Sequence, residues 1–234
     1  MLTQVKVCGI CRPEDAQLAV DLGASAIGFV FWPGSPRCIE PGRARAIAAS
    51  LPDGVLAVGV FVDQPAEDVI EIARTVRLDA IQLHGSERVE DFGGLRQRVI
   101  KAVAVGEAFD PSVVDALPET VTVLLDAHDP IRRGGTGRTI DWTIAAAIAQ
   151  RRDTILSGGL NPSNVAEAVS RVRPHMVDVS SGVEAAPGRK DQTKLRDFFS
   201  AIRMADLSAS AKATASPPEP RRRRKVSTTE ASER

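Results

Sequence analysis

The sequence predicts a single (β/α)8 TIM barrel, an α/β fold in which eight parallel strands alternate with eight helices. Short, nearly continuously apolar runs recur along the chain, as expected for strands that are buried on both faces. Longer amphipathic segments separate them, which favours parallel β/α units. The 234 residues are enough for one such barrel, which typically takes about 250 residues. The expected strands lie at residues 4–9, 25–31, 56–62, 80–85, 99–105, 121–126, 154–159 and 176–182.

Eight helices are expected between and after these strands, at residues 13–22, 41–51, 65–75, 87–97, 111–117, 140–150, 161–172 and 191–202. Several begin with a proline in the first turn, such as Pro13 and Pro41, or with a polar residue just before it. A doubly wound open sheet would show the same alternation, so it remains the alternative architecture. No GxGxxG motif follows the first run, so the sequence does not indicate a dinucleotide-binding start.

The chain divides into a predicted barrel domain, residues 1–204, and a tail, residues 205–234. The tail is rich in Ala, Ser, Pro and charge, cannot bury a core, and is predicted to be disordered. The formal net charge of zero splits into −3 for residues 1–204 (23 Lys and Arg, 26 Asp and Glu) and +3 for the tail (7 and 4). The run RRRRK at 221–225 admits a nucleic-acid-binding interpretation. A solvated tail is the simpler one, and nucleic acid is not an expected partner.

Composition excludes several functional classes. No run of eighteen or more apolar residues is present, so no membrane span is expected, and the first residues do not have the pattern of a signal peptide. The chain has three cysteines, an odd number and too few for a disulfide framework. This favours a reducing, cytoplasmic location. An aromatic content of 4% argues against a surface that stacks bases or sugars.

In a barrel of this kind the active site lies at the C-terminal ends of the strands, which selects the residues to consider. Cys8 ends the first strand and should project into the mouth of the barrel, although a buried thiol is also a common core residue. Cys8 and Cys11 also form a CxxC pair. Redox chemistry would need a thioredoxin-type context and zinc would need further ligands, so neither is favoured and no metal site is expected.

Two further polar residues satisfy the same criterion. Asp126 ends the sixth strand after an apolar run, where a carboxylate is costly unless it is paired or functional. Arg37 lies in the loop after the second strand, and its guanidinium is suited to bind a carboxylate through parallel hydrogen bonds. A surface salt bridge is the alternative role for Arg37. The nearby segment 134–139, GGTGRT, lacks the spacing of a phosphate loop and is interpreted as a flexible active-site loop.

Glycine-bearing turns follow the last two strands, at 157–164 and 180–188. Loops at these positions of a barrel often bind phosphate, because glycine lets backbone N–H groups approach the oxygens. The candidate phosphate-binding residues are Gly158, Gly159, Ser181 and Gly182. Ordinary tight turns are the alternative. The two turns together predict a phosphorylated small molecule as ligand.

The motifs KVCGICRPED, FVFWPGSPR, VGVFVDQ, IQLHG, LLDA, GGTGRTIDW, LSGGLNPSNV, DVSSGVE and PGRKD occur in that order. As a set they resemble the signatures of the phosphoribosylanthranilate isomerase family over roughly residues 4–203. Cys11 departs from the usual pattern, since the family has another small or polar residue there, and the tail has no family counterpart. Related barrel isomerases of histidine synthesis use two aspartates, so Cys8 disfavours that enzyme. A barrel that binds phosphate without catalysis is disfavoured because Cys8 and Asp126 are both present.

The resemblance implies an Amadori rearrangement in tryptophan biosynthesis, without a cofactor, by a monomer or homodimer. It implies that Cys8 is the general base, Asp126 the general acid, Arg37 the residue that binds the anthranilate carboxylate, and the two glycine turns the phosphate loops. Asp126 would hold a proton near neutral pH and Cys8 would ionise there. Lys6 and His84 are candidates for supporting roles. Strand alternation places Lys6 on the same face as Cys8, deeper in the barrel.

Overall fold

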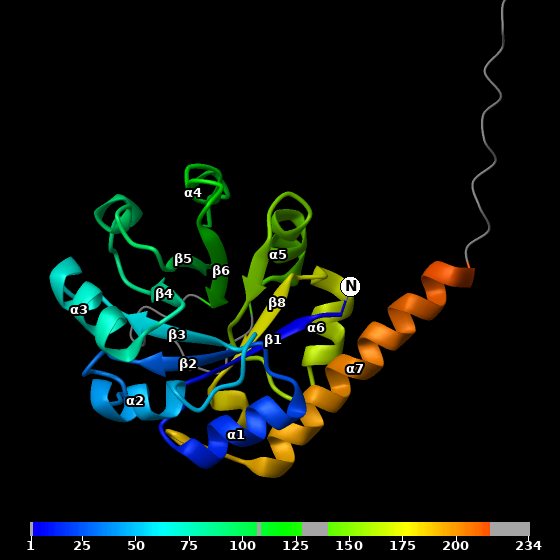
Figure 1. The fold of residues 1–234 in the computed structure, drawn as a ribbon. Coiled ribbons are helices and arrows are strands. Elements are labelled where there is room, and N and C mark those ends of the chain that lie inside the picture. Colours follow the sequence, from blue (N-terminus) through cyan, green and yellow to red (C-terminus); the bar gives the residue numbers. More distant parts are fainter. Residues whose placement is uncertain (1, 107–108, 128–139, 216–234) are drawn as a thin grey trace, which may run out of the picture.

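In the computed structural model, which describes residues 2–106, 109–127 and 140–215, eight parallel strands close into a barrel (Figure 1). Each strand pairs with the next, and β1 also pairs with β8, which completes the closure. The barrel confirms the predicted fold class and excludes the open sheet. The strands are β1 (Gln4–Cys8), β2 (Ala26–Val30), β3 (Leu56–Phe61), β4 (Ala80–Leu83), β5 (Arg98–Val105), β6 (Thr122–Ala127), β7 (Thr154–Leu156) and β8 (Met176–Val179).

Helices surround the barrel and connect successive strands (Figure 1). Pro13 and Pro41 occupy the first turns of their helices, as predicted, because the fixed φ of proline suits that position. A small hairpin, β9 (Glu184–Ala186) and β10 (Arg189–Lys190), follows the 3-10 turn η2 (Ser181–Val183). The α-helices are α1 (Pro13–Leu22), α2 (Pro41–Ala48), α3 (Ala66–Val76), α4 (Ser112–Asp115), α5 (Trp142–Ala149), α6 (Val165–Val172) and α7 (Gln192–Ala215).

Two predicted helices are much shorter in the structure. The helix expected at 87–97 is a single 3-10 turn, η1 (Val89–Phe92), which ends where Gly93 and Gly94 begin, because glycine is a poor helix former. The helix expected at 111–117 is reduced to the one turn of α4, which is bounded by Pro111 and Pro118. On this side of the barrel, loops replace full helices.

The last helix runs beyond the predicted end of the barrel domain. α7 continues past Met204 to Ala215, through a segment rich in alanine, the best helix former. Asp206 binds the backbone N–H of Thr3 at 2.9 Å and its hydroxyl at 2.8 Å, which ties the helix to the start of β1. Residues 207–211 of α7 are exposed, with Leu207 63% accessible. The predicted RRRRK segment lies outside the described residues. No described helix is long and apolar enough to span a bilayer.

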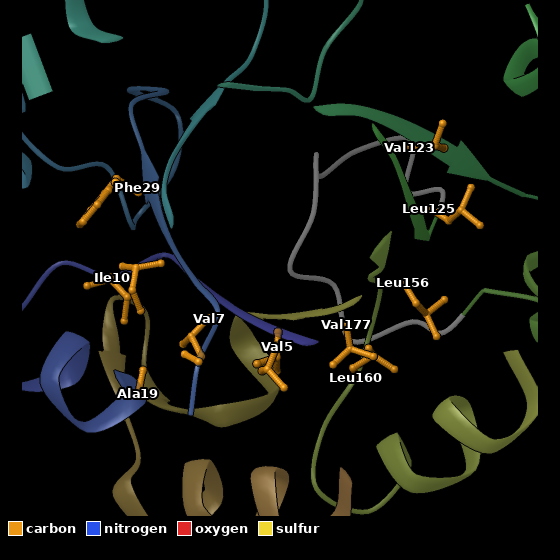
Figure 2. Packing of buried hydrophobic residues seen from close by; sticks show 14 of the residues in the cluster. Val5, Val7, Ile10, Ala19, Phe29, Val123, Leu125, Leu156, Leu160 and Val177 are labelled. Atoms are coloured by element: carbon orange, nitrogen blue, oxygen red, sulfur yellow. The ribbon is translucent and has the colours of Figure 1, made fainter. Parts of the chain in front are cut away.

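Alternation along the strands divides the buried residues into two sets. Side chains that point away from the barrel axis pack against the helices and form the main core; Figure 2 shows Val7, Phe29, Leu125 and Val177 in this set. The inward set is smaller and forms a layer across the barrel interior: Ala26, Val58, Ala80, Ile100, Leu124, Ile155 and Met176. Further toward the C-terminal ends of the strands, the buried polar residues Gln82, Asp126 and Asp178 occur beside a small apolar cluster of Cys8, Val30 and Val60, so the chemistry-bearing side chains gather at this end.

The inward layer provides a test of the fold. Leu124 is fully buried in it, so Leu124→Ala should lower the free energy of unfolding by about 2–5 kcal/mol, through lost burial and the cavity that remains. Urea denaturation with linear extrapolation measures this loss. Leu207→Ala, on the exposed part of α7, is the matched control and should change stability by no more than about 0.5 kcal/mol. Equal effects of the two substitutions would contradict the placement of Leu124.

Candidate active site

The C-terminal ends of the strands bring the predicted polar residues to one end of the barrel. Cys8 is the last residue of β1, Asp126 is the penultimate residue of β6, and His84 follows β4 directly. Because all eight strands are parallel, these side chains belong to the same rim. Cys8 pairs in register with Gly28 of β2. A Cβ at Gly28 would lie 2.8 Å from the sulfur of Cys8, so glycine leaves the space that the thiol occupies.

Burial controls the ionisation of Cys8. The residue is 7% exposed, and burial raises the pKa of its thiol above the ordinary value. The positive charges of Lys6 and Lys190 act to lower this pKa, and the carboxylate of Asp178 acts to raise it. The net direction is upward, which differs from the expectation that Cys8 ionises near neutral pH. The sequence shows the nearby lysine but not how completely the thiol is removed from water.

Lys6 lies in the barrel interior on the same face as Cys8, as alternation predicts. Its Nζ lies 2.8 Å from Oδ1 of Asp178, and its side chain is fully buried. Burial opposes the charge on Lys6, but attraction to Asp178 and to Cys8 outweighs it and raises the pKa of Lys6. The hydroxyl of Ser157 donates to the other carboxylate oxygen of Asp178 at 3.3 Å. Asp178 therefore keeps Lys6 protonated, and the ammonium group of Lys6 lies in the interior next to the thiol.

Asp126 is nearly buried, and neighbouring groups bind both of its carboxylate oxygens. Its Oδ1 accepts the backbone N–H of Ala127 at 2.8 Å, and its Oδ2 lies 3.1 Å from Nε2 of His84. The loop after β7 passes close by, since a Cβ at Gly158 would lie 3.1 Å from Oδ1 of Asp126. Gly158 also has a φ of +85°, which glycine adopts without strain. One of the candidate phosphate-binding glycines therefore packs directly against the candidate acid.

Arg37 is engaged by a residue that the sequence did not single out. Its Nε and Nη2 donate to the carboxylate of Glu184, at 2.9 Å to Oε1 and 2.7 Å to Oε2 respectively. Glu184 also accepts from Nζ of Lys190 at 3.0 Å, and Lys190 donates to the carbonyl of Cys8 at 2.7 Å. Burial acts to raise the pKa of Glu184, yet hydrogen bonds and attraction from Arg37 and Lys190 hold it below the ordinary value. Arg37 is thus neither free nor in a simple surface salt bridge.

Neither Glu184 nor Lys190 could be assigned to this role from spacing. Both stand in motifs of the sequence, but they lie on the β9–β10 hairpin, far along the chain from Arg37. The feature that identifies Glu184 and Lys190 as functional candidates is that both charged side chains are buried. Burial is known only from the folded structure, so the sequence could not show it. Arg37 also packs over Gly9, where a Cβ would lie 2.5 Å from the Arg37 Cδ atom. The guanidinium therefore lies next to the end of β1.

The two glycine turns contact each other. A side chain at Gly182, in η2 after β8, would overlap the carbonyl oxygen of Leu160 in the loop after β7. The side-chain amides of Asn161 and Asn164 donate to the carbonyl of Gly159 at 3.2 and 3.0 Å and fix the shape of that loop. The two turns that carry the candidate phosphate-binding residues are therefore adjacent.

Other residues named in the sequence are placed as follows. Cys8, Cys11 and Cys38 are free, and the sulfur of Cys11 contacts the carbonyl of Arg37 at 3.3 Å. Residues 134–139 of the predicted active-site loop lie outside the described residues. Within the part of the chain that the structure describes, no three His, Cys, Asp or Glu side chains are grouped to hold a metal ion.

Comparison with known proteins gives one consistent family. A family model described as N-(5'phosphoribosyl)anthranilate (PRA) isomerase matches residues 5–201. A protein named N-(5'-phosphoribosyl)anthranilate isomerase, from Pelobacter propionicus, is 45% identical over 200 residues, which cover 85% of this chain and 94% of that protein. The match spans the barrel from β1 into α7.

Solved structures agree. Phosphoribosyl anthranilate isomerase from Thermotoga maritima superposes with a TM-score of 0.80 at 42% identity, covering 87% of this chain and 100% of the other. The isomerase solved in complex with reduced 1-(o-carboxyphenylamino)-1-deoxyribulose 5-phosphate gives 0.77 at 41% identity, with coverages of 87% and 100%. A Thermotoga maritima structure of monomers generated from a dimeric form gives 0.77 at 40% identity, again with coverages of 87% and 100%. The chain therefore belongs to the phosphoribosylanthranilate isomerase family.

Proposed function

We propose that this protein converts N-(5-phosphoribosyl)anthranilate into 1-(2-carboxyphenylamino)-1-deoxyribulose 5-phosphate, the Amadori rearrangement of tryptophan biosynthesis. The observation that carries the proposal is the presence of Cys8 and Asp126 at one rim of a closed barrel that matches the family from residue 5 to 201. A related isomerase has been solved with a reduced form of the product. The reaction needs proton transfer only, so the chain's own side chains can supply it without a cofactor.

The proposed mechanism has two proton transfers. Asp126 donates a proton to the furanose oxygen as the bond from C1 to that oxygen breaks, and the nitrogen lone pair forms a protonated Schiff base at C1. Cys8, as thiolate, then removes the proton from C2, and the electrons of that bond move to form the enolamine. Tautomerisation, in which the C2 hydroxyl loses a proton and C1 gains one, gives the ketone. Proton exchange with water then returns Cys8 to the thiolate and Asp126 to the acid, so the cycle balances without an external oxidant or reductant. General acid and base groups each contribute typically about 10²–10⁴-fold to rate.

The remaining contacts would hold the two ends of the substrate. The phosphate would bind at the adjacent turns that contain Gly158, Gly159, Ser181 and Gly182. The anthranilate carboxylate would bind to Arg37. The carboxylate of Glu184 accepts hydrogen bonds from Nε and Nη2 of Arg37. Nη1 is the guanidinium nitrogen that Glu184 does not contact, and it would bind the anthranilate carboxylate. The reacting carbons would then lie between Cys8 and Asp126.

The location and assembly of the protein follow from the same proposal. A thiol that serves as base loses its function when it is oxidised, and Cys8, Cys11 and Cys38 are all free. We therefore infer a reducing cytoplasmic location. A Thermotoga maritima relative is described as dimeric, and monomers have been generated from it. We therefore infer that this chain is either a homodimer or a monomer.

The activity and its catalytic pair can be tested together. The purified protein should accelerate the loss of anthranilate-type fluorescence when it is added to freshly made phosphoribosylanthranilate. Cys8→Ala and Asp126→Asn should each lower kcat by at least about 10²-fold with little change in KM, since each removes a proton-transfer group. Cys38→Ala, which removes an exposed cysteine, is the control and should retain wild-type turnover. Near-wild-type turnover of either active-site variant would refute its assignment, and no acceleration by the wild type would refute the function.

Arg37 should act on binding rather than on chemistry. Arg37→Ala should raise KM by an amount equivalent to about 1.5–3 kcal/mol, the usual loss for a hydrogen bond to a charged group. Steady-state kinetics separates KM from kcat. Arg12→Ala removes an arginine that pairs at the surface with Glu14, and it should leave both constants unchanged. An unchanged KM for Arg37→Ala would place the carboxylate site elsewhere.

The pH dependence of kcat/KM should report the burial of Cys8. A base must be deprotonated to act, and burial raises the pKa of the Cys8 thiol in the free protein. The value of kcat/KM should therefore increase with pH, with a midpoint above the ordinary range of a thiol, about 8.5. A pH-rate profile measured at substrate concentrations below KM gives this midpoint. A rising limb centred well below that value would contradict the role of burial.

A further inference from the structure

We propose that Gln82 is a positioning residue that holds the ring proton of His84 on Nε2 and so directs the proton of Asp126 toward the substrate. The proposal rests on the function proposed above, in which Asp126 is the acid. It assigns a purpose to a buried amide that the proton-transfer mechanism alone does not use.

Three inward-facing side chains form a continuous chain of contacts. Nε2 of Gln82 lies 3.0 Å from Nδ1 of His84, and Nε2 of His84 lies 3.1 Å from Oδ2 of Asp126. Gln82 is on β4 and is 1% exposed, while the outward neighbours of this strand, such as Leu83, pack in the main core. His84 continues the strand pairing by one residue, because its backbone N–H donates to the carbonyl of Phe61 on β3 at 2.9 Å. The backbone therefore fixes both side chains on the same face.

The contact with Gln82 decides where the histidine carries its proton. An amide N–H2 is a donor only, so Nδ1 of His84 must be the acceptor, and a neutral ring then carries its hydrogen on Nε2. That hydrogen points to Oδ2 of Asp126. In the described part of the chain the carbonyl oxygen of Gln82 is buried without a partner.

Reversing the amide would leave its N–H2 group unpaired instead of the carbonyl. Among backbone groups, buried N–H groups without partners are rarer than buried carbonyls without partners, and we apply the same preference to this side-chain amide. The reversed amide would also place an acceptor against Nδ1 and require the opposite tautomer. Burial therefore favours the arrangement in which Gln82 donates, even though one of its atoms remains unsatisfied.

This tautomer has a chemical consequence at Asp126. A ring nitrogen that already carries hydrogen cannot accept the proton of Asp126, so that proton is available to the furanose oxygen. After the transfer, the same N–H donates to the new carboxylate and stabilises it, since hydrogen bonds to a charged acceptor are the stronger ones. In the opposite tautomer, Nε2 would present a lone pair to Asp126 and compete with the substrate for its proton.

Nitrogen NMR of the histidine side chains tests the tautomer without reference to activity. The chain has three histidines, so His128→Gln and His175→Gln variants identify the His84 signals by elimination. We expect Nε2 of His84 to be protonated and Nδ1 to be bare in the wild type. In Gln82→Glu we expect Nδ1 to be protonated instead, because a carboxylate accepts the hydrogen of that nitrogen. A protonated Nδ1 in the wild type would overturn the proposal.

Kinetics then tests the consequence. Gln82→Glu should lower kcat at least about tenfold, which is less than the loss of Asp126 itself. KM should stay within about twofold, because Gln82 contacts His84 and is not one of the residues proposed to bind substrate. Gln17→Glu makes the same chemical change on the exposed face of α1 and should leave kcat and KM unchanged. If Gln82→Glu reverses the tautomer but keeps wild-type kcat, the proposed role of Gln82 fails.

A second variant covers the case in which a buried glutamate prevents folding. Gln82→Met keeps the length of the side chain but donates no hydrogen bond, so His84 should show both tautomers and kcat should fall by a smaller factor than in Gln82→Glu. A single, unchanged tautomer in Gln82→Met would also overturn the proposal. Failure of the proposed function would appear differently, as a wild type with the expected tautomer and no isomerase activity.

Discussion

The ion pair between Lys6 and Asp178 is the constraint around which the barrel interior is organised. Two charges in a buried layer are costly unless each is paired and hydrogen-bonded, and here they lie 2.8 Å apart with Ser157 as an additional donor to the carboxylate. Breaking such a pair by removing one partner typically costs about 3–5 kcal/mol, because the other charge stays buried. The pair joins β1 to β8, the two strands whose contact closes the barrel. It also marks the boundary between the apolar layer and the polar end of the interior.

A second set of charges extends this arrangement to the rim. Lys190 reaches from the β9–β10 hairpin to the carbonyl of Cys8, and it shares Glu184 with Arg37. The end of β1, the hairpin after β8 and the loop after β2 are therefore held by one group of three side chains. The candidate base and the candidate carboxylate-binding residue therefore belong to segments that these hydrogen bonds link. Such cross-links suit a reaction in which the groups must be placed correctly before any bond changes.

The sequence predicted much of this structure because the relevant signals are local. Apolar runs located all eight strands, and the period of two along β1 placed Lys6 and Cys8 on one face. The short η1 was missed because amphipathic spacing alone does not show that Gly93 and Gly94 end the helix. The contacts of Glu184 with Arg37 and of Gln82 with His84 could not be predicted. The first depends on how the hairpin folds back, and the second on which rotamers the barrel interior allows.

The raised pKa of Cys8 bears on the order of the proposed steps. In the free protein burial favours the neutral thiol, so the thiolate that acts as base is a minor form whose population rises with pH. The first proton transfer, from Asp126, would produce a protonated Schiff base beside the thiol. A positive charge near a buried thiol favours its ionised form, as Lys6 and Lys190 already do in part. The same charge also makes the proton on C2 more acidic. Ring opening would thus stabilise the thiolate and acidify C2 at the same step, so a cysteine that burial keeps mostly neutral in the free protein could serve as base once its thiol has ionised.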